Sequence, residues 1–315
     1  MEAPHYSIVI PVYNSGAWLT DLVSRIEAAM RPLDASFEVI LVNDASPDKT
    51  TWQVIQELSK ERDYVRGFDM LYNVGQFRAL LCGLEQCRGK QIITMDDDLQ
   101  HPPEEVPKLV QAMKAHPGVD CVMGEYQCKR HGAIRNLGSA LAQKIMDKLY
   151  DKPPGIRTTS FRIMTADLAK ALTLYRTAHP QLGPLIVRVT KNIVNVPVAH
   201  AARPFGTSGY RLIRLVSETL RSVVNASVAP LRFISAIGLI CAAAAFIIGL
   251  YYLAKWLLGD IGVPGYASLI ITIAFFSGMI LFSIGVLGEY IGRIVQELTG
   301  MPRFTIRTST DEIQR

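Results

Sequence analysis

The sequence has few cysteines and histidines, and neither residue type is spaced to hold a metal. The five cysteines among 315 residues show no paired spacing, and the six histidines form no His-x-x-x-His pair. We interpret the cysteines as reduced and mostly structural, as is typical of a cytosolic catalytic domain. The formal net charge is only +5, and no basic stripe is interleaved with aromatic residues. This pattern argues against nucleic acid as a partner.

Charged residues are absent from two long stretches in the C-terminal part of the chain, Phe233–Ala254 and Tyr266–Gly288. Each is long enough to cross a hydrocarbon core of about 30 Å. The connection Gly259–Gly265 is short, so we predict two transmembrane helices that form a hairpin over residues 232–288. The alternative is a helical hairpin buried in a soluble core.

The charges that flank this hairpin predict its orientation. The cations near its outer ends are Arg232, Arg293, Arg303 and Arg307. The connecting turn has only Lys255 and Asp260 nearby. Because cytoplasmic flanks carry the excess of Lys and Arg, both termini and the catalytic domain are expected in the cytoplasm. The protein would then be a multi-pass protein of the cell (inner) membrane, with residues 289–315 as a cytoplasmic tail.

The first part of the chain alternates apolar runs with helical patterns. Strands are predicted at residues 7–11, 37–42, 66–71, 91–95 and 119–123, and helices at 17–30, 50–62, 77–87 and 103–115. This alternation indicates an α/β fold with a mostly parallel sheet. Ligands of such sheets bind outside the carboxyl ends of the strands. The polar residues expected to converge there are Tyr13, Asn14, Asn43, Asp44 and residues 96–98.

An acidic cluster follows the fourth predicted strand. Asp96, Asp97 and Asp98 are adjacent, and a helix start at Pro103 comes soon after them. Carboxylates this close repel one another and raise each other's pKa, which a cation would relieve. Hard oxygen ligands suit Mg²⁺ or Mn²⁺, and both ions also bind diphosphates. A solvated acidic turn before the helix is the alternative. The position of the cluster after a strand favours metal–diphosphate binding.

Two further stretches combine apolar residues at helical spacing with arginine and lysine. They cover about residues 133–150 and 206–231. Either one alone could be an ordinary packed helix. Beside membrane spans, cationic amphipathic helices more often lie in the interface against anionic lipid, so membrane lipid is an expected partner.

Several motifs, taken in order, resemble family 2 glycosyltransferases of the GT-A fold: Val9–Asn14, Val42–Ser46, Asn73–Gln76 and Asp96–Glu104. Arg203–Ser208 and a hairpin that ends in Gly288–Arg293 narrow the resemblance to the polyprenol-phosphate glycosyltransferases. That group includes dolichol-phosphate mannosyltransferases, prophage-type bactoprenol glucosyltransferases and undecaprenyl-phosphate formamido-arabinose transferases. The resemblance extends to about Arg307.

This resemblance implies a Rossmann-like GT-A catalytic domain over residues 1–205, followed by the interface helices and the hairpin. It implies an inverting, metal-dependent transfer of a hexose or pentose from a nucleotide-sugar to polyprenyl (undecaprenyl or dolichyl) phosphate. The product would serve cell-envelope glycan or lipid modification. A UDP-sugar is the favoured donor and GDP-mannose the other candidate. The resemblance does not specify which sugar is transferred or how long the prenol is. It is also compatible with either a monomer or a homo-oligomer.

The resemblance also assigns roles residue by residue. Pro11, Tyr13 and Asp44 would hold the base and ribose, Asp97 would add charge near the sugar, and Arg203 would contact the diphosphate. The implied metal ligands are Asp96, Asp98 and Gln100, and the implied acceptor-phosphate residues are Arg130, Arg135 and Ser139. Asp98, Arg130 and Arg135 would be catalytic. An alternative for Asp44 is capping of the following helix, and each arginine could be an ordinary surface cation.

The sequence departs from the group's pattern at two positions that bear on function. Gly209 stands where relatives usually carry Lys, and Ser160 stands where many carry Asp before Phe161-Arg162. These departures keep open a catalytically degenerate, membrane-anchored nucleotide-sugar-binding or scaffold protein. A processive polysaccharide synthase is disfavoured because the Gln-x-x-Arg-Trp motif is absent. A two-span channel is disfavoured because neither span carries a charge.

Overall fold

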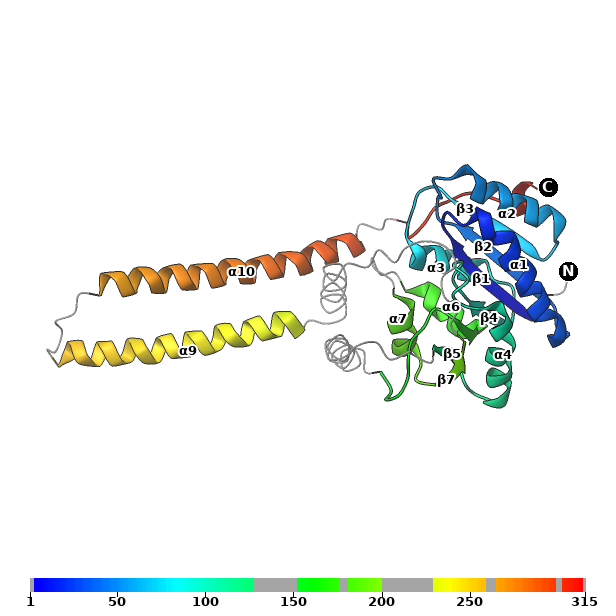
Figure 1. Ribbon diagram of the computed structural model, residues 1–315. Coiled ribbons are helices and arrows are strands. Elements are labelled where there is room, and N and C mark those ends of the chain that lie inside the picture. The colour runs from blue at the N-terminus through cyan, green and yellow to red at the C-terminus, as the bar shows by residue number, and fades with distance from the viewer. Residues whose placement is uncertain are drawn as a thin grey trace. The chain divides into compact units, whose positions relative to one another are not determined.

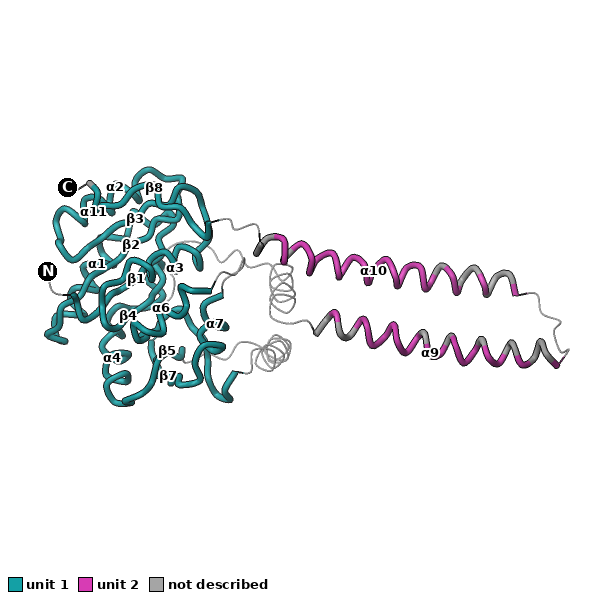
Figure 2. Tube along the Cα trace, turned by 180° about the vertical axis from the view of Figure 1, so that it is seen from behind, with its two compact units in different colours: residues 1–210, 302–315 teal, residues 211–301 magenta. Residues whose placement is uncertain are grey.

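The computed structural model describes residues 3–126, 152–175, 181–199, 229–258, 265–298 and 302–313. The chain forms two compact units, which are coloured separately in Figure 2. The first comprises residues 1–210 and 302–315, and the second comprises residues 211–301. The predicted interface helix at 133–150 lies outside the described residues, as does the one at 206–231 as far as residue 228.

An eight-stranded mixed sheet forms the centre of the first unit (Figure 1). Its spatial order is β7 (Ile193–Val198), β5 (Cys121–Tyr126), β6 (Arg162–Thr165), β4 (Gln91–Thr94), β1 (Tyr6–Val12), β2 (Phe37–Asn43), β3 (Val65–Met70) and β8 (Ile306–Ser309). Strands β4, β1, β2 and β3 are parallel, whereas β6 and β8 run antiparallel to their neighbours. The predicted α/β class and the strands predicted as β1 to β5 are confirmed.

Helices cover both faces of this sheet. One face carries α1 (Gly16–Met30), α2 (Lys49–Glu61) and α4 (Val106–Ala115), with a 3-10 turn at Pro103–Glu105 before α4. The other carries α3 (Gln76–Gln86), α6 (Ala166–Leu174) and α7 (Leu182–Val189). The alternation of side chains along a strand explains the two layers. In β1, Ile8 and Ile10 lie in the first core and Val9 in the second.

The expectation of a separate tail from residue 289 was wrong. Helix α10 (Tyr266–Leu298) continues past that point, and residues 302–315 belong to the first unit. Strand β8 pairs antiparallel with β3, and the short helix α11 (Thr310–Ile313) follows it. The physical reason is that β3 would otherwise be an edge strand with a row of unpaired backbone groups, which β8 covers.

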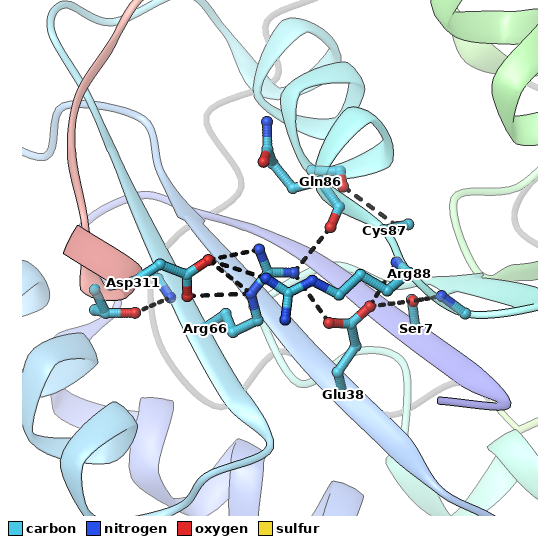
Figure 3. A network of polar contacts seen from close by, with 11 residues as sticks. Ser7, Glu38, Arg66, Gln86, Cys87, Arg88 and Asp311 are labelled. Carbon is cyan, nitrogen blue, oxygen red and sulfur yellow. Dashed lines mark hydrogen bonds and ion pairs between the residues drawn. The ribbon is translucent and has the colours of Figure 1, made fainter. Parts of the chain in front are cut away.

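A buried polar network anchors this C-terminal segment near the amino ends of β1, β2 and β3 (Figure 3). The guanidinium of Arg66 contacts Glu38 at 3.0 Å and Asp311 at 2.7 Å, and it donates to the Gln86 carbonyl at 2.9 Å. The other oxygen of Glu38 accepts from the Ser7 hydroxyl at 2.6 Å. The side chain of Arg66 is only 10% exposed, so its positive charge and its N–H groups depend on these partners.

The second unit consists, in its described residues, of α9 (Ala229–Leu257) and α10, which run side by side in opposite directions (Figure 2). Within α10, Phe275–Gly292 is long and apolar enough to cross a membrane, with a mean hydropathy of 1.5 and none of it buried. Helix α9 contains a shorter apolar stretch, Ile234–Ile248. Large apolar side chains are exposed on both helices, among them Leu239, Phe246, Leu281 and Phe282. Exposed apolar surface of this extent is typical of a membrane-interacting segment.

We predict that Arg66→Met lowers the free energy of unfolding by about 3–5 kcal/mol, because it leaves the buried Glu38 carboxylate without its cation. Arg88→Gln is the matched control. Arg88 contacts Asp311 at 3.4 Å and its side chain is 55% exposed, so its loss should cost less than about 1 kcal/mol. Denaturant unfolding of the detergent-solubilised protein measures both. Equal losses in the two variants would contradict the anchoring role of Arg66.

Candidate active site

A cavity of about 330 Å³ lies at the carboxyl ends of β1, β2 and β4. Its lining residues are Pro11, Val12, Tyr13, Asp44, Asn73, Gly75, Gln76, Asp96, Asp97 and Asp98. It brings together all the described residues predicted for the nucleotide-sugar, along with Asp98. Gln100 is not among the lining residues, but its backbone N–H donates to Asp98 Oδ1 at 3.1 Å. Arg130, Arg135, Ser139 and Arg203 lie outside the described residues.

Asp44 connects the end of β2 to the loop that precedes α3. Its carboxylate accepts from the backbone N–H of Val74 at 2.7 Å and from that of Gly75 at 2.9 Å. The Asn73 side chain donates to the Asp44 carbonyl at 3.0 Å. Burial raises the pKa of Asp44, and the two backbone N–H groups oppose that rise. Each oxygen keeps a second lone pair for a ligand hydroxyl or N–H.

The alternative role for Asp44, capping of the next helix, does not hold. The residue before α2 is Asp48, which accepts hydrogen bonds from the Thr50 and Thr51 hydroxyls. The Asp44 carboxylate instead binds the backbone N–H groups of Val74 and Gly75, in the loop on the cavity wall.

Neutral hydrogen-bond donors hold Asp96 in place. Gln76 Nε2 donates to Oδ1 at 2.6 Å, and the Ser160 hydroxyl donates to Oδ2 at 2.7 Å. The backbone N–H of Asp96 donates to Nδ1 of His101 at 3.2 Å, and that ring stacks against Phe161. These donors orient the carboxylate without cancelling its charge, so the charge stays available to a cation.

Asp97 has a structural role in addition to the one that the resemblance implies. The cavity includes Asp97, but its Oδ2 accepts from the Tyr13 backbone N–H at 3.0 Å and from the Ser15 hydroxyl. Its carbonyl accepts from Trp18 Nε1 at 2.6 Å. Asp97 thus fastens the loop between β1 and α1. Burial raises the pKa of Asp97 to about 6, and the charges of its two Asp neighbours raise it by smaller amounts. Mutual repulsion, the cause expected from the sequence, is therefore secondary to burial.

Each strand that reaches the cavity is followed by a residue in the left-handed backbone region. These are Asn14 with φ 56°, Ala45 with φ 48° and Leu99 with φ 59°. Such conformations are unfavourable for residues other than glycine, and they concentrate at functional sites that the surrounding structure holds in place. Gly75, with φ 86° and ψ 152°, adopts another positive-φ conformation on the cavity wall, one that is accessible mainly to glycine.

The donor set fits a divalent metal that a substrate completes. Within the described residues, no group of three or more His, Cys, Asp or Glu side chains converges to hold a metal by itself. Mg²⁺ is usually held by one or two carboxylates together with water and substrate phosphates. Asp96 and Asp98 provide two carboxylates on one cavity wall, and their hard oxygens also suit Mn²⁺.

Asn73–Gln76 is one of the motifs that carry the resemblance, but no role was predicted for its residues, and Ser160 was known only as a departure from the family pattern. The structure shows that Gln76 and Ser160 donate to the Asp96 carboxylate and that Asn73 donates to the backbone carbonyl of Asp44. The motif was the available signal for Asn73 and Gln76. Ser160 carried no comparable signal, because its contact with Asp96 depends on the pairing of β6 with β4.

Comparison with known proteins agrees with this architecture. The profile of "Glycosyl transferase family 2" matches residues 7–173, and that of the "GtrB C-terminal hairpin" matches residues 229–294. An undecaprenyl-phosphate 4-deoxy-4-formamido-L-arabinose transferase of Pseudomonas paraeruginosa is 33% identical over 304 residues, covering 95% of this chain and 88% of the relative. The enzyme of the same name from Aeromonas hydrophila is 33% identical over 305 residues, covering 95% and 92%.

Solved structures share the fold at low sequence identity. A mannosyltransferase from Pyrobaculum calidifontis in complex with GDP-Man and Mn²⁺ has a TM-score of 0.51 and 17% identity, covering 96% of this chain and 89% of the other. Glucosyl-3-phosphoglycerate synthase from Mycobacterium tuberculosis, in complex with Mn²⁺, UDP-glucose and glycerol 3-phosphate, has a TM-score of 0.51 and 18% identity, covering 70% and 78%. The family match over more than half of the chain, together with relatives above 30% identity, shows that the chain belongs to glycosyl transferase family 2.

Proposed function

We propose that this family 2 glycosyltransferase moves a sugar from a nucleotide-sugar to polyprenyl phosphate at a membrane surface. The observation that carries the proposal is one cavity that gathers Asp44, Asp96 and Asp98 at the carboxyl ends of parallel strands. The same chain carries an apolar hairpin that matches the GtrB C-terminal hairpin. The relatives that are similar over nearly their whole length are named as transferases for undecaprenyl phosphate.

On the donor side, Pro11, Tyr13 and Asp44 would contact the base and ribose, with a UDP-sugar favoured over GDP-mannose. Asp96 and Asp98, with Gln100, would hold Mg²⁺ or Mn²⁺. The metal would stabilise negative charge on the departing nucleoside diphosphate. Arg203 would bind the same diphosphate, because a guanidinium pairs with phosphate oxygens in a planar fork.

On the acceptor side, the lipid phosphate needs no strong general base, because its second pKa is about 6 and it is largely dianionic near neutral pH. Ser160, which donates to Asp96 where many relatives carry an acid, is compatible with a reaction of this kind. Arg130, Arg135 and Ser139 would guide the phosphate to the far face of the anomeric carbon. In-line attack from that face inverts the centre, and catalysis reduces to orientation and charge stabilisation.

The proposed setting is the cell (inner) membrane, with residues 232–288 crossing it twice. The catalytic unit and both termini would face the cytoplasm, and the basic stretches at 133–150 and 206–231 would lie against anionic lipid. The lipid tail could then stay in the bilayer while its phosphate enters the site.

The direct test is transfer itself. Membranes that contain the protein are incubated with polyprenyl phosphate and a panel of labelled nucleotide-sugars in the presence of Mg²⁺ or Mn²⁺. Lipid-linked label from one donor supports the enzyme. Saturable nucleotide-sugar binding without any transfer would support the alternative, a degenerate binding or scaffold protein.

For the metal, we predict that Asp98→Asn lowers transfer by at least about 100-fold, as does excess EDTA. An asparagine oxygen can still accept the Gln100 backbone N–H, so the local turn should persist. Glu104→Gln is the control, because Glu104 is exposed and pairs with Arg25 away from the cavity. Robust turnover of Asp98→Asn, or in EDTA, would rule out the metal role.

We further predict a split between two arginines. Arg135→Ala should raise the KM for polyprenyl phosphate about tenfold through loss of a charge-assisted contact, with little effect on the donor. Arg203→Ala should weaken nucleotide-sugar binding instead. Steady-state kinetics with each substrate varied in turn measure both effects. Impaired donor binding with unchanged acceptor kinetics in Arg135→Ala would refute the assignment of the acceptor phosphate.

The orientation gives a separate prediction. A single cysteine introduced near Gly262 should react with an impermeant thiol reagent on intact cells, and a cysteine at residue 315 should not, in a background with the native cysteines replaced. The reason is that the cations bracket the outer ends of the hairpin. The reverse labelling pattern would show that the catalytic unit faces the other side.

A further inference from the structure

The segment that follows the membrane hairpin holds the loop that leads into the donor cavity. The backbone N–H of Leu71 donates to the Thr305 carbonyl at 2.8 Å. The Leu71 carbonyl accepts from Nη2 of Arg307 at 2.9 Å. Both backbone groups at the start of the loop after β3 are therefore bound by this segment, and the loop continues to Asn73, Gly75 and Gln76 on the cavity wall.

Arg307 also starts a line of polar contacts beneath that wall. Its Nη1 lies 3.5 Å from Asp69 Oδ2, and Asp69 Oδ1 accepts from Asn43 Nδ2 at 2.7 Å. The Asp69 side chain is 7% exposed. Asn43 is the last residue of β2, and Asp44 directly follows it. The Arg307 guanidinium is thus connected to Asn43, the residue before Asp44, through the single buried carboxylate of Asp69.

The line continues past Asn43 to the loop after β1. The Ser46 hydroxyl donates to Asn43 Oδ1 at 2.6 Å, and the backbone N–H of Asn14 donates to Ser46 Oγ at 2.9 Å. Asn14 and Ala45, which this line holds, are both in the left-handed region. Loops in unfavourable conformations persist only where surrounding contacts hold them.

We infer that Arg307 is a positioning residue for the donor site: through Leu71, Asp69 and Asn43 it sets the loops after β3, β2 and β1 that form the nucleotide-sugar cavity. The inference rests on the proposed function for the identity of the ligand. Arg307 lies outside both matched ranges, residues 7–173 and 229–294. A catalytic unit truncated at residue 173, where the family match ends, would lack the contacts that Arg307 makes with these loops.

The exposure of Arg307 separates positioning from stability. Its side chain is 55% exposed, so its guanidinium stays largely solvated, and the Asp69 carboxylate, although only 7% exposed, keeps the hydrogen bond from Asn43 Nδ2 when Arg307 is replaced. The same segment is anchored instead by the partly buried contact between Asp311 and Arg66. Replacement of Arg307 should therefore leave the fold intact while loosening the loops.

The experiment compares Arg307→Gln with Arg307→Lys and a control, Arg303→Gln, in the full-length protein. Arg303 lies on the same segment, but it contacts Glu85 at 2.6 Å and the Tyr175 carbonyl at 3.1 Å, away from the cavity. Two quantities are measured: the KM for the donor against that for polyprenyl phosphate, and the rate of backbone amide exchange over residues 71–76.

Arg307→Gln should raise the donor KM roughly five- to tenfold, leave the acceptor KM within about twofold, and speed amide exchange over residues 71–76 by at least about threefold. Arg307→Lys, which keeps the charge opposite Asp69 but only one of the two contacts in good geometry, should lie between Arg307→Gln and the wild type. Arg303→Gln should match the wild type in both quantities.

The inference is overturned if Arg307→Gln matches the wild type in either quantity, or if Arg303→Gln changes both to the same extent, since a general loss of docking would then explain the result. Absence of transfer by the wild-type protein would be a failure of the proposed function. In that case the exchange rates of the three variants alone decide whether Arg307 holds the loops.

Discussion

The parallel pairing of β1 with both β2 and β4 is the constraint on which the site depends. Its register places Val12 opposite Asn43 and Val9 opposite Thr94. The next residues along these strands are Tyr13, Asp44 and, after Met95, Asp96, so they emerge at one edge of the sheet. A shift of one residue in either pairing would turn the following side chains to the other face. Packing of the two hydrophobic cores on either face of the sheet fixes this register, and the register in turn places the site residues.

Several carboxylates converge where the parallel strands end and repel one another, and the loops hold them with uncharged hydrogen-bond donors. Asp44 uses backbone N–H groups, Asp96 uses an amide and a hydroxyl, and Asp97 uses a backbone N–H and a hydroxyl. Neutral donors fix a carboxylate in one orientation and leave its charge in place. The buried guanidinium of Arg162 acts electrostatically on Asp96, but four carboxylates among the described residues line the cavity, and this excess of negative charge favours a divalent cation.

The elements predicted from the sequence are those with a strong local pattern. Strand β1 contains the apolar run Ile8–Val12, and α1 repeats its apolar residues at helical spacing, so both were predicted to within a residue or two. Strand β8 has one apolar residue, β6 begins with the buried Arg162, and β7 contains Pro197, so none of the three was predicted. Their positions are set by pairing with distant strands. For the same reason Asp44 and Asp96 were predicted to line the site, while the partners Gln76 and Ser160 were not.

Arginine contacts at both ends of the β3–β8 pair bind the C-terminal segment to the rest of the unit, and the two sets differ in burial and strength. At the amino end of β3, Arg66 is buried and bound to Glu38 and Asp311, so its contacts are strong and removal leaves a charge stranded. At the carboxyl end, Arg307 is half exposed and its ion pair is weak, but it acts on loops that are themselves strained. From the sequence alone, Arg307 is predicted to be a cation that flanks the membrane hairpin. Because β8 (Ile306–Ser309) follows α10 in the sequence, the contacts that hold the donor loops come from residues C-terminal to the hairpin, and the sheet lacks its last strand until those residues are added.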